Sequence, residues 1–338
     1  MKNKLAMKAI VMTATGGPEV LQLQTLPKPT IRQPGEVLIQ LKGAGINPVD
    51  TKLRTRGTFY PDRSPTILGC DGAGIVDAVG EEVKNFKKGD EVYFCFGGIG
   101  GPEGNYREYA VVDHRFIAKK PKKLSFVEAS AAPLVLITAW EALHDRAQIQ
   151  PEHRVLIHGG AGGVGHVAIQ LAKQTGAQVC TTVSSEEKGE FARSLGADHV
   201  INYRETDFVE AIMEWTDSKG VDVAFDTVGG ETFAKSCGAV AMYGDLVTIL
   251  QPDANMNWST ARARNLRFSL ELMLTPMHQG LISALEHQTD ILHCCAELFD
   301  SERLRLHLQQ TFPLAEAAAA HRLLEQGGMM GKLALEVG

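Results

Sequence analysis

A short apolar run, Val155–Ile157, is followed by glycines at the spacing used by phosphate-binding loops. Gly160, Gly162 and Gly165 form the pattern Gly-x-Gly-x-x-Gly. In such loops the first glycine permits a tight turn, the second lets the backbone approach a pyrophosphate, and the third lets helix pack on strand. Apolar residues at helical spacing follow, and a helix N-terminus offers free N–H groups to phosphate. The pattern predicts a dinucleotide site with contacts at Gly160, Gly162, Gly163, Val164 and Gly165.

The residues after the next apolar run, 178–183, indicate which dinucleotide is bound. An NAD site usually has Asp or Glu there, which accepts a hydrogen bond from the ribose 2′-hydroxyl. This chain has Ser184, Ser185 and Lys188, which offer two hydroxyls and a cation to a 2′-phosphate. Glu186 and Glu187 argue for NADH unless the helix directs them outward. We therefore predict NADPH.

The elements that must position these residues change character along the chain. Up to about residue 120, short strand-like runs alternate with Gly- and Pro-rich turns, which is typical of a small β-barrel. Ser125 and Glu128 have the spacing of a capping box and predict a helix start. From 154 to 270 short β-branched runs alternate with helical stretches, which predicts a parallel sheet with helical crossovers. Helices near 281–300 and 314–326 and a final strand at 332–337 complete the prediction.

Composition excludes several classes of protein. The 338 residues carry a net charge of −6 and include 44% hydrophobic residues, which is ordinary for a globular protein and disfavours a nucleic-acid partner. No apolar run is long enough to predict a membrane-spanning helix. The six cysteines are scattered without a C-x-x-C pair, so we expect free thiols and a cytoplasmic location.

Three further motifs carry a family resemblance. They are Gly45-Ile46-Asn47-Pro48-Val49-Asp50-Thr51-Lys52, Leu68-Gly69-Cys70-Asp71-Gly72-Ala73-Gly74 and Leu136-Ile137-Thr138-Ala139-Trp140-Glu141-Ala142-Leu143. With the glycine loop, they resemble the zinc-independent quinone oxidoreductase and alkenal (enone) reductase branch of the medium-chain dehydrogenase/reductase superfamily. The resemblance implies an α/β protein with two domains. A discontinuous GroES-like β-barrel catalytic domain, residues 1–130 and 274–338, would surround a Rossmann doubly wound parallel-sheet domain, residues 131–273, with the active site in the cleft between them.

The resemblance also implies that no metal takes part. Zinc-dependent relatives hold the catalytic ion with Cys, His and Cys, and the matching positions here are Asn47, Cys70 and Leu134. An amide and an aliphatic side chain do not replace two strong zinc ligands. Relatives with a structural zinc use four closely spaced cysteines, whereas the corresponding region here offers only Cys95.

Candidate site residues follow from the same resemblance. Asn47 is expected to orient the carbonyl of the acceptor, and Lys52 and Tyr60 to face the site, either of them being a possible proton donor beside solvent. Other positions are expected to contact the cofactor: Thr138 at the start of the helix entering the Rossmann domain, Tyr203 beside the 2′-phosphate, and, lining other parts of the cofactor, Thr227, Val228, Ile249, Leu250 and Met330.

The function implied is hydride transfer from NADPH to a quinone or an α,β-unsaturated carbonyl compound without a metal. Such acceptors delocalise negative charge, so a hydrogen-bond donor suffices where an alcohol dehydrogenase needs a Lewis acid. Two alternatives stay open: an NADPH-binding protein with little turnover, and a zinc alcohol dehydrogenase. Relatives pair through the edge strand of the Rossmann sheet, here expected near 267–270, so the resemblance implies a homodimer.

Overall fold

The computed structural model describes residues 6–63 and 65–338, and the chain divides into two compact units. Unit 1 comprises the described residues of Met1–Leu134, Leu274–Glu302 and Leu306–Gly338. Unit 2 comprises Val135–Met273 and Arg303–Arg305. Among the helices described, none has the length and apolar character needed to cross a membrane.

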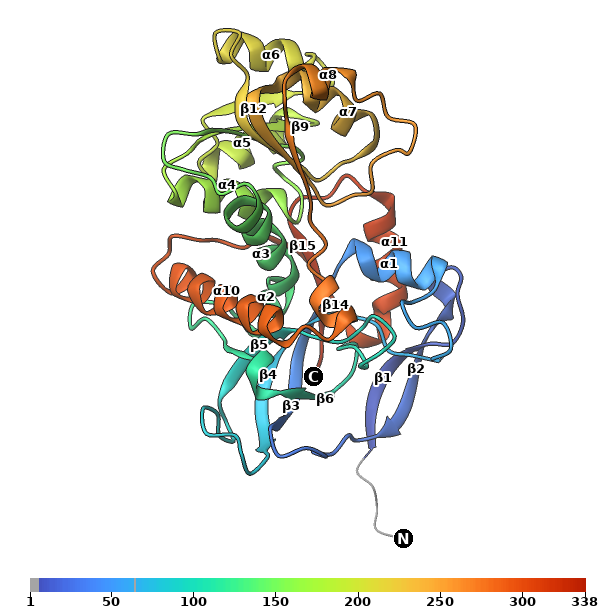
Figure 1. Ribbon diagram of the computed structural model, residues 1–338. Coiled ribbons are helices and arrows are strands. Elements are labelled where there is room, and N and C mark those ends of the chain that lie inside the picture. Colours follow the sequence, from blue (N-terminus) through green and yellow to red (C-terminus); the bar gives the residue numbers. More distant parts are fainter. Residues whose placement is uncertain (1–5, 64) are drawn as a thin grey trace. The chain divides into compact units, whose positions relative to one another are not determined.

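Unit 2 contains a six-stranded sheet in the order β10-β9-β8-β11-β12-β13 (Figure 1). Every neighbouring pair is parallel, which confirms the predicted parallel sheet. Counted from β8, the strand order is 3-2-1-4-5-6, that of the Rossmann fold, in which the order of the strands reverses between the first and the fourth. The strands are β8 (Arg154–Ile157), β9 (Gln178–Val183), β10 (His199–Asn202), β11 (Val221–Asp226), β12 (Val240–Thr248) and β13 (Arg267–Leu270).

Helices connect these strands because parallel neighbours require crossovers. The crossovers are α4 (Gly165–Gln174), α5 (Glu186–Ser194), α6 (Phe208–Trp215), α7 (Gly230–Ala239) and α8 (Ser259–Ala263). The apolar face predicted after the glycine loop is buried in α4, where Gly165 to Ala172 are all enclosed. Unit 2 begins within α3 (Pro133–Trp140), which continues as the π-helical turn η3 (Glu141–Arg146).

Unit 1 contains a seven-stranded sheet with the path β14-β15-β3-β4-β5-β7, and β6 also pairs with β3. The last strand, β15, pairs antiparallel with β3, so residues near the two ends of the chain meet in one sheet (Figure 1). A separate hairpin joins β1 to β2. The strands are β1 (Ala6–Met12), β2 (Leu21–Pro27), β3 (Glu36–Ile46), β4 (Asp71–Val79), β5 (Glu91–Cys95), β6 (Tyr109–Asp113), β7 (Ala118–Lys119), β14 (Leu308–Pro313) and β15 (Lys332–Glu336).

The helices of unit 1 include the one predicted from the capping box. Ser125 Oγ accepts from the backbone N–H of Glu128, and the Glu128 carboxylate accepts from the backbone N–H of Ser125, as predicted. The α-helices are α1 (Pro48–Arg56), α2 (Phe126–Ala131), α9 (Thr275–Gln279), α10 (Ile282–Asp300) and α11 (Ala317–Gln326), with 3₁₀ turns η1 (Pro18–Val20), η2 (His114–Phe116) and η4 (Leu314–Glu316).

Helix α1 is an addition that the sequence patterns did not indicate. It begins with Pro48, whose fixed φ and missing N–H suit the first turn of a helix. Its N-cap is Asn47, whose backbone N–H donates to the Asp50 carboxylate at 2.8 Å. Arg54 of α1 pairs with Glu325 of α11 at 2.5 Å, so a helix from each end of the chain lies beside the other (Figure 1).

Candidate functional site

The glycine loop of unit 2 connects β8 to α4, as predicted. A Cβ on Gly165 would lie 2.2 Å from the carbonyl oxygen of Gly159, so only glycine lets α4 start this close to the loop. A Cβ on Gly160 would lie 2.0 Å from Thr181 Oγ1 of β9. Gly160 therefore permits close packing on β9, whereas the left-handed residue of the turn is Gly159 (φ +66°). This corrects the predicted role of Gly160.

The other loop residues leave the start of α4 accessible. A Cβ on Gly162 would meet only the carbonyl oxygen of Gly159, at 3.2 Å, so its other side is open to an approaching group. Gly163 and Val164 are half-buried, and no side chain caps the helix at Val164. Uncapped N–H groups at a helix N-terminus form a natural phosphate site.

Residues at the carboxyl ends of β11 and β12 lie beside this loop. Thr227 Oγ1 donates to the carbonyl oxygen of His158, at the end of β8, at 2.8 Å. The Asp226 carboxylate accepts from the backbone N–H of Val228 at 3.0 Å, and Ile249 N–H donates to the Asp226 carbonyl at 3.3 Å. Leu250 follows, held by Thr248 Oγ1. The structure thus gathers Thr227, Val228, Ile249 and Leu250 at the edge where Rossmann folds bind ligands.

The residues predicted to select the cofactor also lie together. Lys188 Nζ donates to Ser184 Oγ at 3.3 Å, and Ser185 caps α5 by accepting from the Lys188 backbone N–H at 3.4 Å. Glu186 is exposed and pairs at 2.6 Å with Arg193 of the same helix, so an arginine balances its charge. Tyr203 is exposed just after β10, and its backbone N–H donates to the carbonyl of Val183, the residue before Ser184.

Two predicted cofactor contacts are placed differently from the rest. Thr138 is buried in the second half of α3 rather than at the start of a helix, because the helix begins five residues earlier at Pro133. Met330 belongs to unit 1, where its backbone N–H donates to Gln309 Oε1 at 2.7 Å.

His158, at the end of β8, is a buried structural residue. Its Nδ1 lies 3.1 Å from Thr182 Oγ1 and its Nε2 2.8 Å from Ser236 Oγ. Burial lowers the pKa of His158 to about 4, although the Asp226 carboxylate opposes the shift. The imidazole is therefore neutral at physiological pH and ties β8 to β9 and α7.

In unit 1, Asn47 is wholly buried. Its Nδ2 donates to Asp71 Oδ2 at 2.8 Å, and its Oδ1 accepts from Lys332 Nζ. The Lys332 ammonium also donates to the carbonyl oxygen of Ile46 at 2.9 Å. This differs from an amide that faces a ligand, because side chains from β4 and β15 enclose it. An acceptor reaches Asn47 only if the atoms around it move.

The buried polar set continues from Asn47 to a histidine. Asp50 Oδ2 accepts from Tyr106 Oη at 3.0 Å, and Tyr106 Oη lies 3.2 Å from His321 Nε2. Burial raises the pKa of Asp50 to about 7, and it lowers that of His321 to about 3. Burial also raises the pKa of Asp71 and lowers that of Lys332, while the charge of each opposes the shift of the other. We interpret the set as an Asp71 carboxylate and a Lys332 ammonium on opposite sides of the Asn47 amide, beside an Asp50 that readily holds a proton.

Lys52 and Tyr60 lie outside this buried set. Lys52 is exposed on α1. Tyr60 is half-buried, and its hydroxyl donates to the carbonyl oxygen of His278 at 3.2 Å. A Cβ on Gly101 would lie 2.7 Å from the Tyr60 ring, so the glycine-rich segment 97–104 packs directly on it. The structure therefore places the three predicted catalytic residues on one segment but in different environments.

The residues at the expected zinc positions do not fit a zinc ion. The Asn47 amide contacts an ammonium group, which repels a metal cation. Leu134 offers only an aliphatic side chain, and its backbone N–H donates to Asp71 Oδ1 at 2.9 Å. Across residues 6–63 and 65–338, no three His, Cys, Asp or Glu side chains are arranged to hold a metal.

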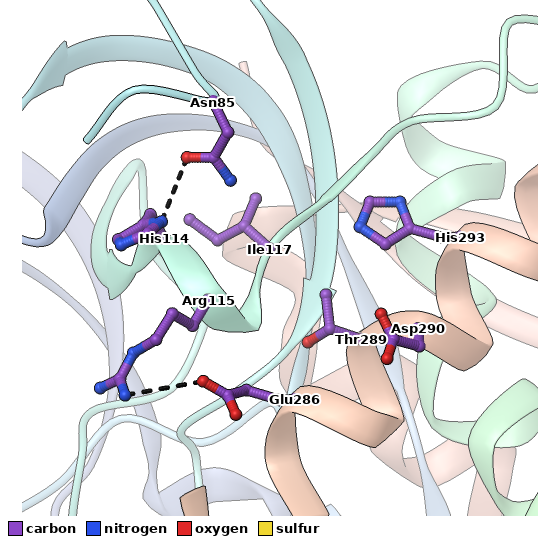
Figure 2. A pocket seen from close by; sticks show the side chains of 8 residues that line it. All are labelled: Asn85, His114, Arg115, Ile117, Glu286, Thr289, Asp290 and His293. Carbon is purple, nitrogen blue, oxygen red and sulfur yellow. Dashed lines mark hydrogen bonds and ion pairs between the residues drawn. The ribbon is translucent and has the colours of Figure 1, made fainter. Parts of the chain in front are cut away.

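A pocket of about 190 Å³ lies elsewhere in unit 1, between η2 and α10 (Figure 2). Inside it His114 contacts Asn85 at 3.1 Å, and Arg115 pairs with Glu286 at 3.7 Å. None of its eight lining residues is a predicted site residue. The pocket therefore does not change the assignment of the candidate site.

Comparison with known proteins identifies the family. Residues 33–122 match the model for an alcohol dehydrogenase GroES-like domain, and residues 195–335 match that for a zinc-binding dehydrogenase. Quinone oxidoreductase 1 of Escherichia coli (strain K12) is 34% identical over 322 residues, which cover 94% of this chain and 95% of that protein. The 2-haloacrylate reductase of a Burkholderia species is 33% identical over 341 residues, covering 97% and 98%.

A solved structure agrees with these matches. The crystal structure of Escherichia coli quinone oxidoreductase complexed with NADPH superposes with a TM-score of 0.85 at 32% identity, covering 97% of this chain and 99% of that one. The predicted fold class, a GroES-like domain with a Rossmann domain, is confirmed. The chain belongs to the medium-chain dehydrogenase/reductase superfamily, in its quinone oxidoreductase branch, and is an oxidoreductase of that kind.

Proposed function

We propose that the protein is a metal-free, NADPH-dependent reductase of quinones or α,β-unsaturated carbonyl compounds. The observation that carries the proposal is the glycine loop of unit 2, where the Gly165 and Gly160 backbones come too close to their neighbours for any side chain. We assign cofactor binding to unit 2 and acceptor binding to unit 1, in keeping with the proposed domains 131–273, and 1–130 with 274–338.

NADPH rather than NADH is supported by the charge at the end of β9. Lys188 and Ser184 offer an ammonium and a hydroxyl 3.3 Å apart, and Glu186 is turned toward Arg193. Tyr203, Ser185 and the glycine-loop residues complete the proposed cofactor contacts. When bound, NADPH supplies a hydride, and the E. coli relative was solved with this cofactor.

Metal independence is supported by the donor set of unit 1. A buried ammonium, that of Lys332, contacts the amide at the position where zinc-dependent relatives have a cysteine ligand. Quinones and unsaturated carbonyls suit such a site, because their reduction spreads negative charge over several atoms and needs less stabilisation by a Lewis acid. The relative named for 2-haloacrylate, an unsaturated carboxylate, supports this class of acceptor.

The acceptor side of the reaction is assigned to Asn47, Lys52 and Tyr60. The reduced acceptor gains a hydride and one proton, so the protein must supply or admit that proton. Lys52 is exposed on α1 and Tyr60 carries a hydroxyl, so either one, or solvent, is available as donor. Asn47 is proposed to orient the acceptor carbonyl once the surrounding atoms admit it.

The experiment that tests the function is NADPH oxidation by the purified protein with an ortho-quinone and an alkenal in parallel, with and without a zinc chelator. We expect turnover of at least one acceptor, unaffected by the chelator. Loss of activity with the chelator would favour a zinc enzyme. Tight NADPH binding without turnover of either acceptor would favour the NADPH-binding protein.

We also propose that the protein is a cytoplasmic homodimer. Strand β13 is at the end of the sheet order, and Phe268 and Leu270 on it are exposed. An unpaired edge strand with exposed apolar side chains is a natural site for pairing with a second copy. The six free cysteines suit a reducing compartment.

A further inference from the structure

Three polar side chains from distant parts of unit 1 meet in its interior. Lys332 is 3% exposed, and Asn47 and Asp71 are not exposed at all. Lys332 begins β15, Asp71 begins β4, and Asn47 lies between β3 and α1. Opposite charges buried close together are costly to desolvate and add little net stability compared with apolar residues of the same volume. Stability alone therefore does not explain this set.

The two charged groups, one on each side, fix the orientation of the Asn47 amide between them. A lysine ammonium only donates hydrogen bonds, and an ionised carboxylate only accepts them. Asn47 Oδ1 therefore faces Lys332, and Asn47 Nδ2 faces Asp71. Rotation of the amide by 180° would place its NH₂ group against the ammonium and its oxygen against the carboxylate, so both contacts would become repulsive.

The Asn47 side chain also takes part in the N-cap of α1. An asparagine at a helix N-cap usually accepts a hydrogen bond from a backbone N–H of the first turn. At the start of α1, Asn47 and Asp50 form a capping box, in which the Asn47 side chain faces the Asp50 backbone N–H and the Asp50 carboxylate accepts from the Asn47 backbone N–H. One N–H of Nδ2 donates to Asp71, and the second has no partner in the described structure.

We propose that Lys332 and Asp71 are positioning residues for the reductase reaction, which hold the Asn47 amide in the one orientation that leaves an N–H for the acceptor carbonyl. This inference rests on the proposed function. The remaining groups around the ammonium, Asp50, Cys70 and Cys95, surround the pair without contacting the Asn47 side chain in any described bond.

An exchange of two side chains tests the proposal. In the double variant Asn47→Asp/Asp71→Asn, the carboxylate and the amide trade places, so charge and volume are unchanged. Lys332 then donates to the carboxylate introduced at position 47. The amide introduced at position 71 donates to the same carboxylate through its NH₂ group, and its oxygen still accepts from the Leu134 backbone. The side chain at position 47 can no longer donate to an acceptor.

A second variant, Lys332→Met/Asp71→Asn, is the matched control for the two charges. It keeps Asn47 but removes the two charges that fix the orientation of the amide. Removing two opposite buried charges at the same time is often neutral for folding. Thermal unfolding and NADPH fluorescence titration show whether each variant folds and binds cofactor. Steady-state kinetics with the quinone and the alkenal then separate kcat from the KM for NADPH.

We expect both variants to fold and to bind NADPH within about two-fold of the wild type. We expect kcat to fall by about 100-fold in the exchanged variant, as for the loss of one preorganised donor, and by about ten-fold or more when the pair is removed. Wild-type kcat in either folded variant would overturn the positioning role and leave the reductase function standing. Failure of both variants to fold would overturn it in favour of a purely structural role. An inactive wild type would instead overturn the proposed function itself.

Discussion

Replacing His158 by glutamine should flatten the pH dependence of the stability of unit 2. The wild-type imidazole is buried between Thr182 and Ser236, and its pKa is lowered from 6.5 to about 4 by that burial. At a pH between these two pKa values, the histidine is protonated in the unfolded chain but stays neutral in the folded one. The stabilisation is therefore complete above pH 6.5 and is lost as the pH falls toward 4.

The magnitude follows from the two pKa values. Lowering the pH from 7 to 4.5 should remove about 2.4 kcal/mol of unfolding free energy through this one residue. Glutamine does not titrate in this range. Between pH 7 and 4.5, the His158→Gln variant should therefore lose about 2.4 kcal/mol less unfolding free energy than the wild type does. At pH 7 the unfolding free energy of the variant should also be lower than that of the wild type, by about 1 kcal/mol or more, because one of the two hydrogen bonds of the imidazole is lost.

Tryptophan fluorescence during urea unfolding measures this effect selectively. All three tryptophans, Trp140, Trp215 and Trp258, belong to unit 2, so the signal reports that unit rather than unit 1. The matched control is His153→Gln, which replaces a half-exposed histidine of the same unit. This control separates the effect of the buried imidazole from that of removing any histidine of the unit.

The reasoning would be refuted by a His158→Gln variant that loses as much stability between pH 7 and 4.5 as the wild type does. That result would mean that the buried imidazole accepts a proton without cost. A change in the baseline at pH 7 alone would not bear on the argument, because it reflects hydrogen bonding and packing rather than titration.

Three further results are expected. Lys188→Ala should raise the KM for NADPH about ten-fold, as for a lost hydrogen bond to a charged group, and leave that for NADH nearly unchanged; equal effects on both would contradict the phosphate role. Gly165→Ala should lower the unfolding free energy of unit 2 by about 2 kcal/mol or more, because its Cβ would lie 2.2 Å from a backbone oxygen, whereas Gly162→Ala, with its nearest contact at 3.2 Å, should cost much less. Leu270→Lys should convert a homodimer to a monomer in sedimentation, and a wild type that is already monomeric would disprove the proposed interface.

Local patterns in the sequence were sufficient to predict most of unit 2. The first parallel strand, the glycine loop and the following helix are consecutive in the chain. The spacing of their residues therefore predicts their arrangement directly. The predicted role of Gly160 as the residue of the tight turn was wrong. The close contact of Gly160 with Thr181 depends on how β8 and β9 align, which the spacing of the glycines does not show. Thr138 was misplaced for a simpler reason, since helix α3 starts before the apolar motif used to locate it.

The environment of Asn47 could not be predicted in this way. Its two side-chain partners are 24 and 285 residues away, and no local period relates them. In the sequence, Lys332 is only the polar first residue of an apolar strand. A charged residue at the buried end of the strand Leu333–Leu335 was the one available signal, and it does not by itself reveal a partner.

The place of β15 beside β3 has a consequence for how the chain folds during synthesis. Residues up to Leu134 are synthesised before unit 2, yet their sheet lacks the neighbour of β3 that carries Lys332 until residue 332 has been made. Unit 2 is nearly continuous in sequence, so it can complete its sheet while the amino-terminal segment is still waiting. In a nascent chain that ends before residue 332, Asp71 and Asn47 lack the Lys332 ammonium. The incomplete unit 1 would then be open to chaperones and proteases.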